Sequence, residues 1–199
     1  MKNQKPPICT GCNKNNAIFQ KGIWCYCAEC QHKMREEANL PRLAELMLNS
    51  GVPDLFIHSR LSDFPTMNLD ANKSYLFSGV VGTGKTHMLA ALAAECLLQQ
   101  KKCKFIESAI FFRKCRKDEF NNGNLLDSVM NVDYLFMDDI GVEKLTEWVY
   151  DTLYQIIGFR YSHKKHIAVS LNNLKVLDDR LLRRLRDMCE FVVLTEQRQ

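Results

Sequence analysis

The sequence lacks any long uninterrupted apolar run. A helix that crosses a bilayer needs about 20 predominantly apolar residues, and no segment of the 199-residue chain approaches this length. The opening stretch, MKNQKPPICTGC, has no apolar core of the kind that secretory signals carry. Internal repeats and low-complexity tracts are also missing. These absences argue against a membrane, secreted or fibrous protein, and they lead us to expect a cytoplasmic globular protein without a membrane partner.

The sequence also gives no reason to expect disulfide bonds. The chain has nine cysteines, but a protein without a secretory signal is expected in a reducing compartment, where cysteines bind metal or stay as thiols. Hydrophobic residues make up 46% of the chain and charged residues 25%. This composition is that of a globular protein, and the length suits one full core plus a small appended module.

The net charge of +4 is modest, but its distribution is uneven. Basic side chains gather near the N-terminus and at two later places along the chain. The three clusters are Lys2, Lys5, Lys14, Lys21, Lys33 and Arg35; Arg113, Lys114, Arg116 and Lys117; and Arg180, Arg183, Arg184 and Arg186. Such clusters permit a polyanionic partner, although most charge runs are solvated surfaces.

The pattern of apolar residues divides the chain into two predicted domains, 1–50 and 51–199. The first contains five of the nine cysteines and a helical stretch, 33–50, with Leu43, Leu46 and Met47 on one face. That face either docks a partner or packs on the core. After a connector at 52–69, strands and helices alternate. The expected strands are 74–79, 103–108, 134–139, 166–173 and 189–196, and the helices are 87–101, 109–120, 147–161 and 178–188. This α/β alternation predicts a five-stranded parallel sheet covered on both faces.

A phosphate-binding loop follows the first of these strands. The motif G-x-x-x-x-G-K-[ST] is matched by Gly79, Val80, Val81, Gly82, Thr83, Gly84, Lys85 and Thr86, and His87 continues into the helix. Glycines let the backbone N–H groups point at phosphate oxygens, and the helix N-terminus favours an anion. The motif predicts that Lys85 contacts the β- and γ-phosphates of ATP and that the Thr86 hydroxyl binds Mg²⁺.

Two acids end the buried strand at 134–139. The carboxyl ends of parallel strands are where α/β sheets place ligand chemistry. We therefore expect Asp138 to bind Mg²⁺ directly or through water, and Asp139 to orient or activate the attacking water. The alternative is that this acidic pair merely ends the strand and begins a turn.

The N-terminal cysteines have the spacing of a zinc site. Cys9 and Cys12 form one C-x-x-C pair, Cys27 and Cys30 form another, and fourteen residues separate the pairs. This spacing is close to that of structural Zn²⁺ sites with four thiolates. So small a segment cannot fold on its own core, so the metal would supply its folding free energy. Cys25 could replace Cys27, and His32 could replace Cys30.

Several segments, taken in order, resemble those of a known group of ATPases. They are GVVGTGKTHMLAAL, YLFMDDIG, TEWVYDTLYQIIGFRY, AVSLNNL and RLLRRLRDMCEFVV. From about residue 51 onward, the chain resembles the DnaC-type replicative helicase loaders and the related IstB transposition ATPases of the AAA+ class. The resemblance implies a P-loop AAA+ core without a C-terminal lid, preceded by the zinc-knuckle module.

The resemblance also implies roles for three residues outside the phosphate loop and the acidic pair. Asn172 is similar to the asparagine that positions water near the γ-phosphate, although Asn173 is equally available. Arg184 is similar to the arginine finger that acts on ATP of a neighbouring subunit, which implies a homo-oligomer, and Arg180 or Arg183 could replace it. Arg198 is similar to the arginine that follows the last strand and contacts nucleotide.

The resemblance implies an ATPase that loads a replicative helicase and contacts single-stranded DNA, with Phe111, Phe112 and Arg113 as candidate DNA contacts. The phenylalanines could instead belong to the core. A transposition helper ATPase is the alternative function, and a small-molecule P-loop kinase is a more distant one.

Overall fold

The computed structural model describes residues 8–10, 12–13, 19–21, 24–118, 124–142 and 145–195. The chain divides into two compact units, 1–45 and 46–199. These units are defined by their internal contacts. The predicted functional domains, 1–50 and 51–199, stay a prediction. None of the helices in the described ranges is long and apolar enough to cross a bilayer.

The first unit contains a small hairpin and the start of a long helix. Strand β1 (Phe19–Lys21) pairs antiparallel with β2 (Trp24–Tyr26). Helix α1 (Ala28–Ser50) follows at once and continues past the end of the unit. The helix begins five residues before the predicted start at Lys33, and the hairpin was not predicted. Because β1 and β2 lie between the two C-x-x-C pairs, the hairpin returns the chain and brings the pairs together.

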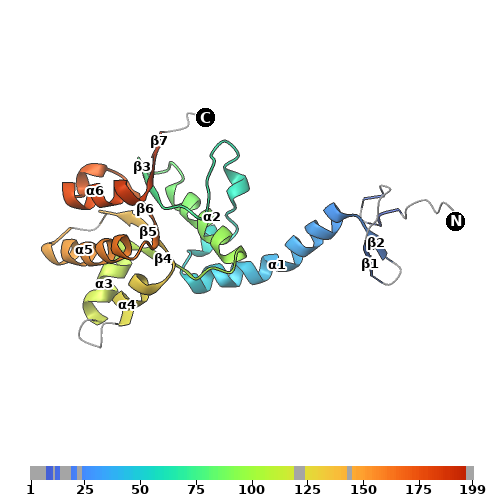
Figure 1. Ribbon diagram of the computed structural model, residues 1–199, viewed down its shortest axis with the longest axis horizontal. Coiled ribbons are helices and arrows are strands. Elements are labelled where there is room, and N and C mark those ends of the chain that lie inside the picture. Colours follow the sequence, from blue (N-terminus) through green and yellow to red (C-terminus); the bar gives the residue numbers. More distant parts are fainter. Residues whose placement is uncertain are drawn as a thin grey trace. The chain divides into compact units, whose positions relative to one another are not determined.

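The second unit is built on a five-stranded parallel sheet, as predicted. Its strands are β3 (Tyr75–Gly79), β4 (Cys103–Glu107), β5 (Tyr134–Ile140), β6 (His166–Leu171) and β7 (Glu190–Leu194). They lie side by side in the order β4-β5-β6-β3-β7. The first strand, β3, therefore lies inside the sheet, with β6 between it and β5 (Figure 1). This order places the end of β6 between the phosphate loop and the acidic pair.

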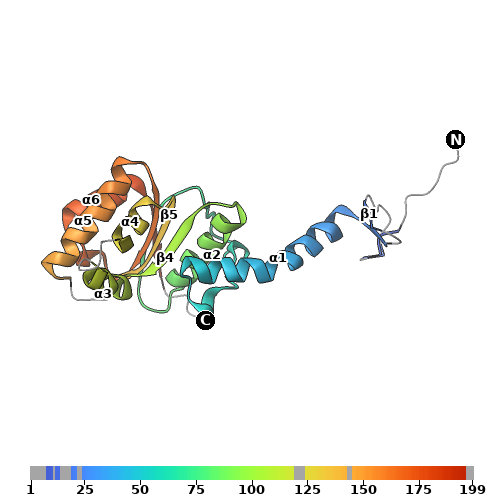
Figure 2. The same ribbon diagram turned by 90° about the horizontal axis from the view of Figure 1, so that it is seen from below.

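Helices cover both faces of the sheet (Figures 1 and 2). They are α2 (Lys85–Leu98), α3 (Ser108–Asp118), α4 (Asn124–Asn131), α5 (Glu147–Ser162) and α6 (Asp179–Met188). Helix α2 lies on one face, and α5 and α6 lie on the other. Short 3-10 turns lie at Asp54–Phe56 (η1), Leu61–Asp63 (η2) and Leu174–Val176 (η4). Helix α4 was not predicted, because eight residues are too few to show a helical period clearly.

Two predictions about helix faces have different outcomes. Helix α5 buries Val149, Leu153, Ile156 and Ile157 as expected. Along α1, Met47 is fully buried and Leu43 is buried, whereas Leu46 is 38% exposed. Met47 also accepts the Val52 N–H at its carbonyl, so it belongs to the second unit. A docking face that includes Met47 is therefore wrong.

The structure also corrects the proposed DNA contacts on α3. Phe111 and Phe112 are each only 3% exposed and belong to the main hydrophobic core. Their rings meet edge to face, and Phe112 meets Trp148 of α5 in the same way. Neither ring can stack on a base, because both lie on the apolar face of α3, which packs into the core. The side chain of Arg113, in contrast, is exposed.

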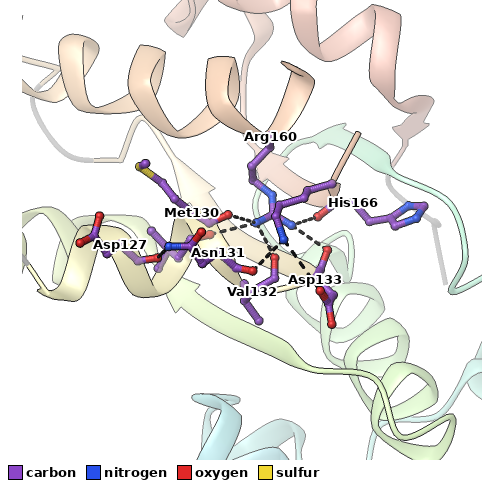
Figure 3. Close-up of polar contacts among 9 residues, drawn as sticks. Asp127, Met130, Asn131, Val132, Asp133, Arg160 and His166 are labelled. Carbon is purple, nitrogen blue, oxygen red and sulfur yellow. Dashed lines mark hydrogen bonds and ion pairs between the residues drawn. The ribbon is translucent and has the colours of Figure 1, made fainter. Parts of the chain in front are cut away.

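A fully buried arginine joins three elements beneath the α5–α6 layer. The Arg160 guanidinium of α5 donates hydrogen bonds to backbone carbonyls, which are its acceptors among the described residues (Figure 3). The acceptors are Val129 (2.9 Å), Met130 (3.3 Å), Val132 (3.0 Å), Asp133 (2.8 Å) and His166. Burial lowers the pKa of Arg160 to about 10, so the group stays charged at neutral pH. Arg160 thereby holds the end of α4 and the starts of β5 and β6 together.

Candidate functional site

The phosphate loop connects the end of β3 to the start of α2. Gly82 and Gly84 have φ values of 87° and 86°, a left-handed conformation that favours glycine. Gly79 is required for a different reason, because a Cβ there would lie 2.4 Å from the Leu194 carbonyl oxygen of β7. Two glycines therefore shape the loop, and the third lets it pass close to the neighbouring strand.

Lys85 is folded into the loop. Its Nζ donates to the carbonyls of Gly79 (2.8 Å) and Val80 (2.9 Å), and the side chain is only 5% exposed. The Thr83 hydroxyl also donates to the Val80 carbonyl, at 2.9 Å. The loop thus holds a buried ammonium group against neutral carbonyl oxygens. Such a cation has unused capacity for an anionic ligand, which fits a phosphate group.

The structure brings together the two predicted Mg²⁺ ligands. Asp138 of β5 is 5% exposed, and its carboxylate accepts hydrogen bonds from the hydroxyls of Thr86 and Ser170. Burial raises the pKa of Asp138, while these two hydrogen bonds oppose the shift. A hydroxyl and a carboxylate on neighbouring elements are oxygen ligands of the kind that Mg²⁺ takes in nucleotide sites. The donor set therefore fits the ion.

Asp139 has an unusual backbone conformation. Its φ is 53°, in the left-handed region that residues other than glycine rarely adopt. Its N–H donates to the Ser170 hydroxyl at 2.8 Å. Its side chain is half-buried, in contrast to that of Asp138. The two acids are thus presented differently, one inside the sheet edge and the other partly in solvent.

The two candidate asparagines after β6 differ in their partners. The Asn173 side chain caps η4, because its Oδ1 accepts the Lys175 N–H at 2.9 Å. Asn172 has a buried Oδ1 that finds no partner among the described residues. A buried oxygen without a partner costs free energy unless a ligand or water satisfies it. This difference favours Asn172 over Asn173 as a ligand-facing group.

The candidate arginines of α6 also have different surroundings. The Arg184 guanidinium lies over the Tyr154 ring, with its carbon 5.8 Å from the ring centroid. Tyr154 in turn donates its hydroxyl to Asp178, which caps α6. Arg180 and Arg183 are exposed. Arg184 is therefore the arginine of this helix that is held in a defined position by α5.

Two further predicted nucleotide contacts, Arg198 and His87, stay predictions. Arg198 is outside the described residues. His87, in the first turn of α2, has its Nε2 2.9 Å from the Asp63 carboxylate and its ring edge-on to Phe64, 4.8 Å between centroids. His87 thus ties the η2 segment to the start of α2.

The structure brings together the four predicted zinc ligands. The sulfur atoms of Cys9, Cys12, Cys27 and Cys30 all lie within 4.8 Å of one another. Those of Cys12 and Cys27 are 3.8 Å apart, and the Cys27 N–H donates to the Cys9 sulfur at 3.2 Å. Zn–S bonds of about 2.3 Å in a tetrahedron put sulfurs roughly 3.8 Å apart, so the quartet fits Zn²⁺. The side chains of the alternative ligands Cys25 and His32 lie outside the described part of the chain.

Four other cysteines, Cys96, Cys103, Cys115 and Cys189, belong to the second unit. Cys96 and Cys115 are buried, and Cys103 and Cys189 are half-buried. Burial raises the pKa of Cys96 and Cys189 to about 12 and that of Cys103 to about 11. The burial or half-burial of all four side chains confirms the prediction that they are core or near-core residues.

Sequence reasoning missed Ser170 at this site, and it missed Arg160 at the opposite end of the sheet. Ser170 interrupts an otherwise apolar buried strand two positions before Asn172, and a polar residue in such a strand is a usable signal. The sequence signal for Arg160 is weaker: it is a charged residue in the last turn of an otherwise apolar helix.

Comparisons with known proteins agree with this geometry. A family model described as "IstB-like ATP binding protein" matches residues 58–192. The replicative helicase loader DnaC of Escherichia coli K12 is 34% identical over 123 residues, which cover 57% of this chain and 50% of DnaC. The phage-like element PBSX protein XkdC of Bacillus subtilis is 28% identical over 142 residues, covering 65% and 52%. The chain thus spans about half the length of these curated relatives.

The fold is similar to that of a solved helicase loader. A crystal structure of the DnaC helicase loader superposes with a TM-score of 0.56 at 26% identity, covering 64% of this chain and 82% of that one. The family model matches more than half of the chain and includes the phosphate loop, both acids, Asn172 and Arg184. The chain therefore belongs to the family of IstB-like ATP-binding proteins.

Proposed function

We propose that this protein is an ATP-dependent helicase loader of DNA replication, acting in the cytoplasm. The observation that carries the proposal is the 34% identity to DnaC, a replicative helicase loader, over 123 residues. The roles below combine this likeness with the geometry of the site.

The residues of the second unit suit ATP binding and hydrolysis. The loop N–H groups and the start of α2 bind the phosphates, while Lys85 exchanges the Gly79 and Val80 carbonyls for phosphate oxygens. Thr86 and Asp138 hold Mg²⁺, which would neutralise phosphate charge when bound. Asp139 and Asn172 orient the attacking water, consistent with the partly exposed carboxylate of Asp139 and the unsatisfied Oδ1 of Asn172.

Hydrolysis in this proposal requires a second copy of the chain. Arg184 is held over Tyr154 and would stabilise transition-state charge on ATP bound by a neighbouring subunit. Arg198 would contact nucleotide from the end of the chain. The active species is therefore a homo-oligomer.

We further propose that the four cysteines bind one Zn²⁺. Protein purified without chelator should contain about one zinc per chain, because one tetrahedral site takes all four thiolates. Cys12→Ser should release the metal and unfold the 1–45 unit, since metal binding and folding are coupled there. Metal content by elemental analysis and melting of the full chain measure both effects.

Cys103→Ser is the matched control for the zinc prediction. Cys103 is a thiol of β4 outside the quartet, so its replacement should leave the zinc content unchanged. In Cys12→Ser the ATP-dependent melting of the second unit should persist. A chelator-free preparation of the wild type that carries no zinc would contradict the metal site.

The proposed partners are the replicative helicase and single-stranded DNA. Purified full-length protein should co-elute with the hexameric replicative helicase of its own source organism in the presence of ATP and Mg²⁺. It should also increase helicase unwinding of substrates with a closed single-stranded region. Loss of both effects in Lys85→Ala would tie them to the nucleotide.

A transposition helper ATPase is the second candidate, because the matching family is described as IstB-like. The same co-elution run with a transposase from the same genome separates the two functions. Association with the transposase and none with the helicase would replace the first proposal by the second. A small-molecule kinase would instead transfer phosphate to a soluble acceptor without any protein partner.

A further inference from the structure

Ser170 lies opposite a break in the pairing of β5 with β6. Before the break Met137 pairs with Val169, and after it Ile140 pairs with Leu171. Asp138 and Asp139 together therefore face the single residue Ser170. Such a bulge leaves one residue without its regular ladder partner, and bulges near active sites often redirect side chains.

The Ser170 hydroxyl fills the gap that the bulge creates. It accepts the Asp139 N–H at 2.8 Å and donates to the Asp138 carboxylate at 2.5 Å. The side chain is fully buried, so no water competes for these bonds. One hydroxyl has one hydrogen and two lone pairs, so a single serine can serve both acids at once.

This arrangement accounts for the conformation of Asp139. Its left-handed backbone, φ 53°, persists only where neighbouring groups fix it. The bond from its N–H to Ser170 is such a restraint. With Asp139 turned in this way, Asp138 stays buried against Thr86, while Asp139 remains partly exposed.

We propose that Ser170 is a positioning residue for ATP hydrolysis, which fixes Asp138 at the Mg²⁺ site and Asp139 toward the attacking water. The inference rests on the proposed ATPase function. Ser170 also lies two residues before Asn172, so the hydroxyl links the strand that carries the acids to the strand that Asn172 follows. The role is indirect, since the Ser170 hydroxyl acts through its hydrogen bonds to Asp138 and Asp139.

Ser74 offers a matched comparison within the same sheet. It is also a buried serine, and its hydroxyl accepts the N–H of Ile167 at 3.1 Å, which joins two strands. Ser74 precedes β3, at the end of the sheet away from the acids. Removing either hydroxyl leaves one buried strand N–H without a partner, but only Ser170 contacts the acidic pair.

The test compares Ser170→Ala, Ser170→Thr, Ser170→Val and Ser74→Ala in the full-length protein. Steady-state kcat and KM for ATP are measured with Mg²⁺, together with affinity for a fluorescent ATP analogue without Mg²⁺ and the melting temperature. Ser170→Ala should lower kcat about tenfold or more, because small misplacements of catalytic groups cost rates of this size. Analogue affinity should change by less than about threefold, because the phosphate loop keeps its own contacts.

The conservative variants separate positioning from folding. Threonine and valine have nearly the same shape and differ by the hydroxyl, so Ser170→Thr should retain most of kcat and Ser170→Val should lose it. This pair decides the question even if Ser170→Ala folds poorly. Ser74→Ala should lower the melting temperature comparably while keeping kcat.

Equal kcat in Ser170→Thr and Ser170→Val would overturn the role of Ser170, with the proposed ATPase intact if the wild type hydrolyses ATP. A wild-type protein without Mg²⁺-dependent turnover would instead overturn the proposed hydrolysis, and the positioning role with it.

Discussion

Lys85→Ala is expected to weaken ATP binding by about 10- to 100-fold, the range that corresponds to losing a charge-assisted hydrogen bond. The ammonium group is already inside the phosphate loop, 2.8 and 2.9 Å from two carbonyl oxygens. A β- or γ-phosphate is a much stronger acceptor for it than a neutral carbonyl. Titration with a fluorescent ATP analogue in the presence of Mg²⁺ measures the loss directly.

Thermal melting distinguishes lost binding from lost folding. A ligand that binds only the folded state raises the melting temperature, so ATP should stabilise the wild type but not Lys85→Ala. Arg184→Ala is the contrasting variant, because the proposed target of Arg184 lies on another subunit. It should keep the ATP-dependent shift while turnover falls. An undiminished ATP shift in Lys85→Ala would rule out the phosphate-loop mechanism.

Arg160→Met is expected to lower the free energy of unfolding of the second unit by about 3 kcal/mol or more, because several carbonyls lose a charged donor and each buried unsatisfied group costs about 1–3 kcal/mol. Five backbone carbonyls lose this donor, and the bond to the Val129 carbonyl is buried. Since small domains are stable by only about 5–15 kcal/mol, this change approaches the limit of folding. Denaturant titration followed by circular dichroism gives the value.

Two control variants test whether the loss of stability is specific to the Arg160 guanidinium. Arg160→Lys keeps the charge, but one ammonium cannot reach all the acceptors of a planar guanidinium, so the loss should be partial. Arg186→Met, at an exposed position of α6, should change stability by no more than about 0.5 kcal/mol. If Arg160→Met unfolds within about 1 kcal/mol of the wild type, the carbonyl network does not stabilise the unit in the way described.

The parts of the site that depend on local sequence could be predicted. The phosphate loop has its own spacing of glycines and lysine, and the buried strands appear as short apolar runs between turns. Since parallel strands end at one edge of a sheet, the predicted parallel sheet was enough to expect Thr86 and Asp138 at the same edge. The zinc quartet was predictable in the same way, from two local pairs of cysteines.

The parts that depend on register or distant backbone could not be predicted. The position of Ser170 matters because a bulge sets two acids against it, and no property of either strand alone reveals that bulge. Arg160 pairs with carbonyl oxygens, which every residue carries, so its partners leave no mark in the sequence. Phe111 and Phe112 of α3 illustrate a different error. Aromatic side chains suit both base stacking and core packing, and the structure places these two in the core.

The Arg160 network also has a consequence for the order in which the second unit folds. Four of the five acceptors precede Arg160 by 27 to 31 residues, and they belong to α4 and the chain that leads into β5. The guanidinium reaches its full set of acceptors only when the 129–133 segment and the start of β6 are both packed against α5. We expect such contacts to form after the transition state, so that their removal changes unfolding rates more than folding rates. The buried arginine is therefore expected to slow unfolding of the second unit. Its loss should raise the unfolding rate and leave the folding rate nearly unchanged.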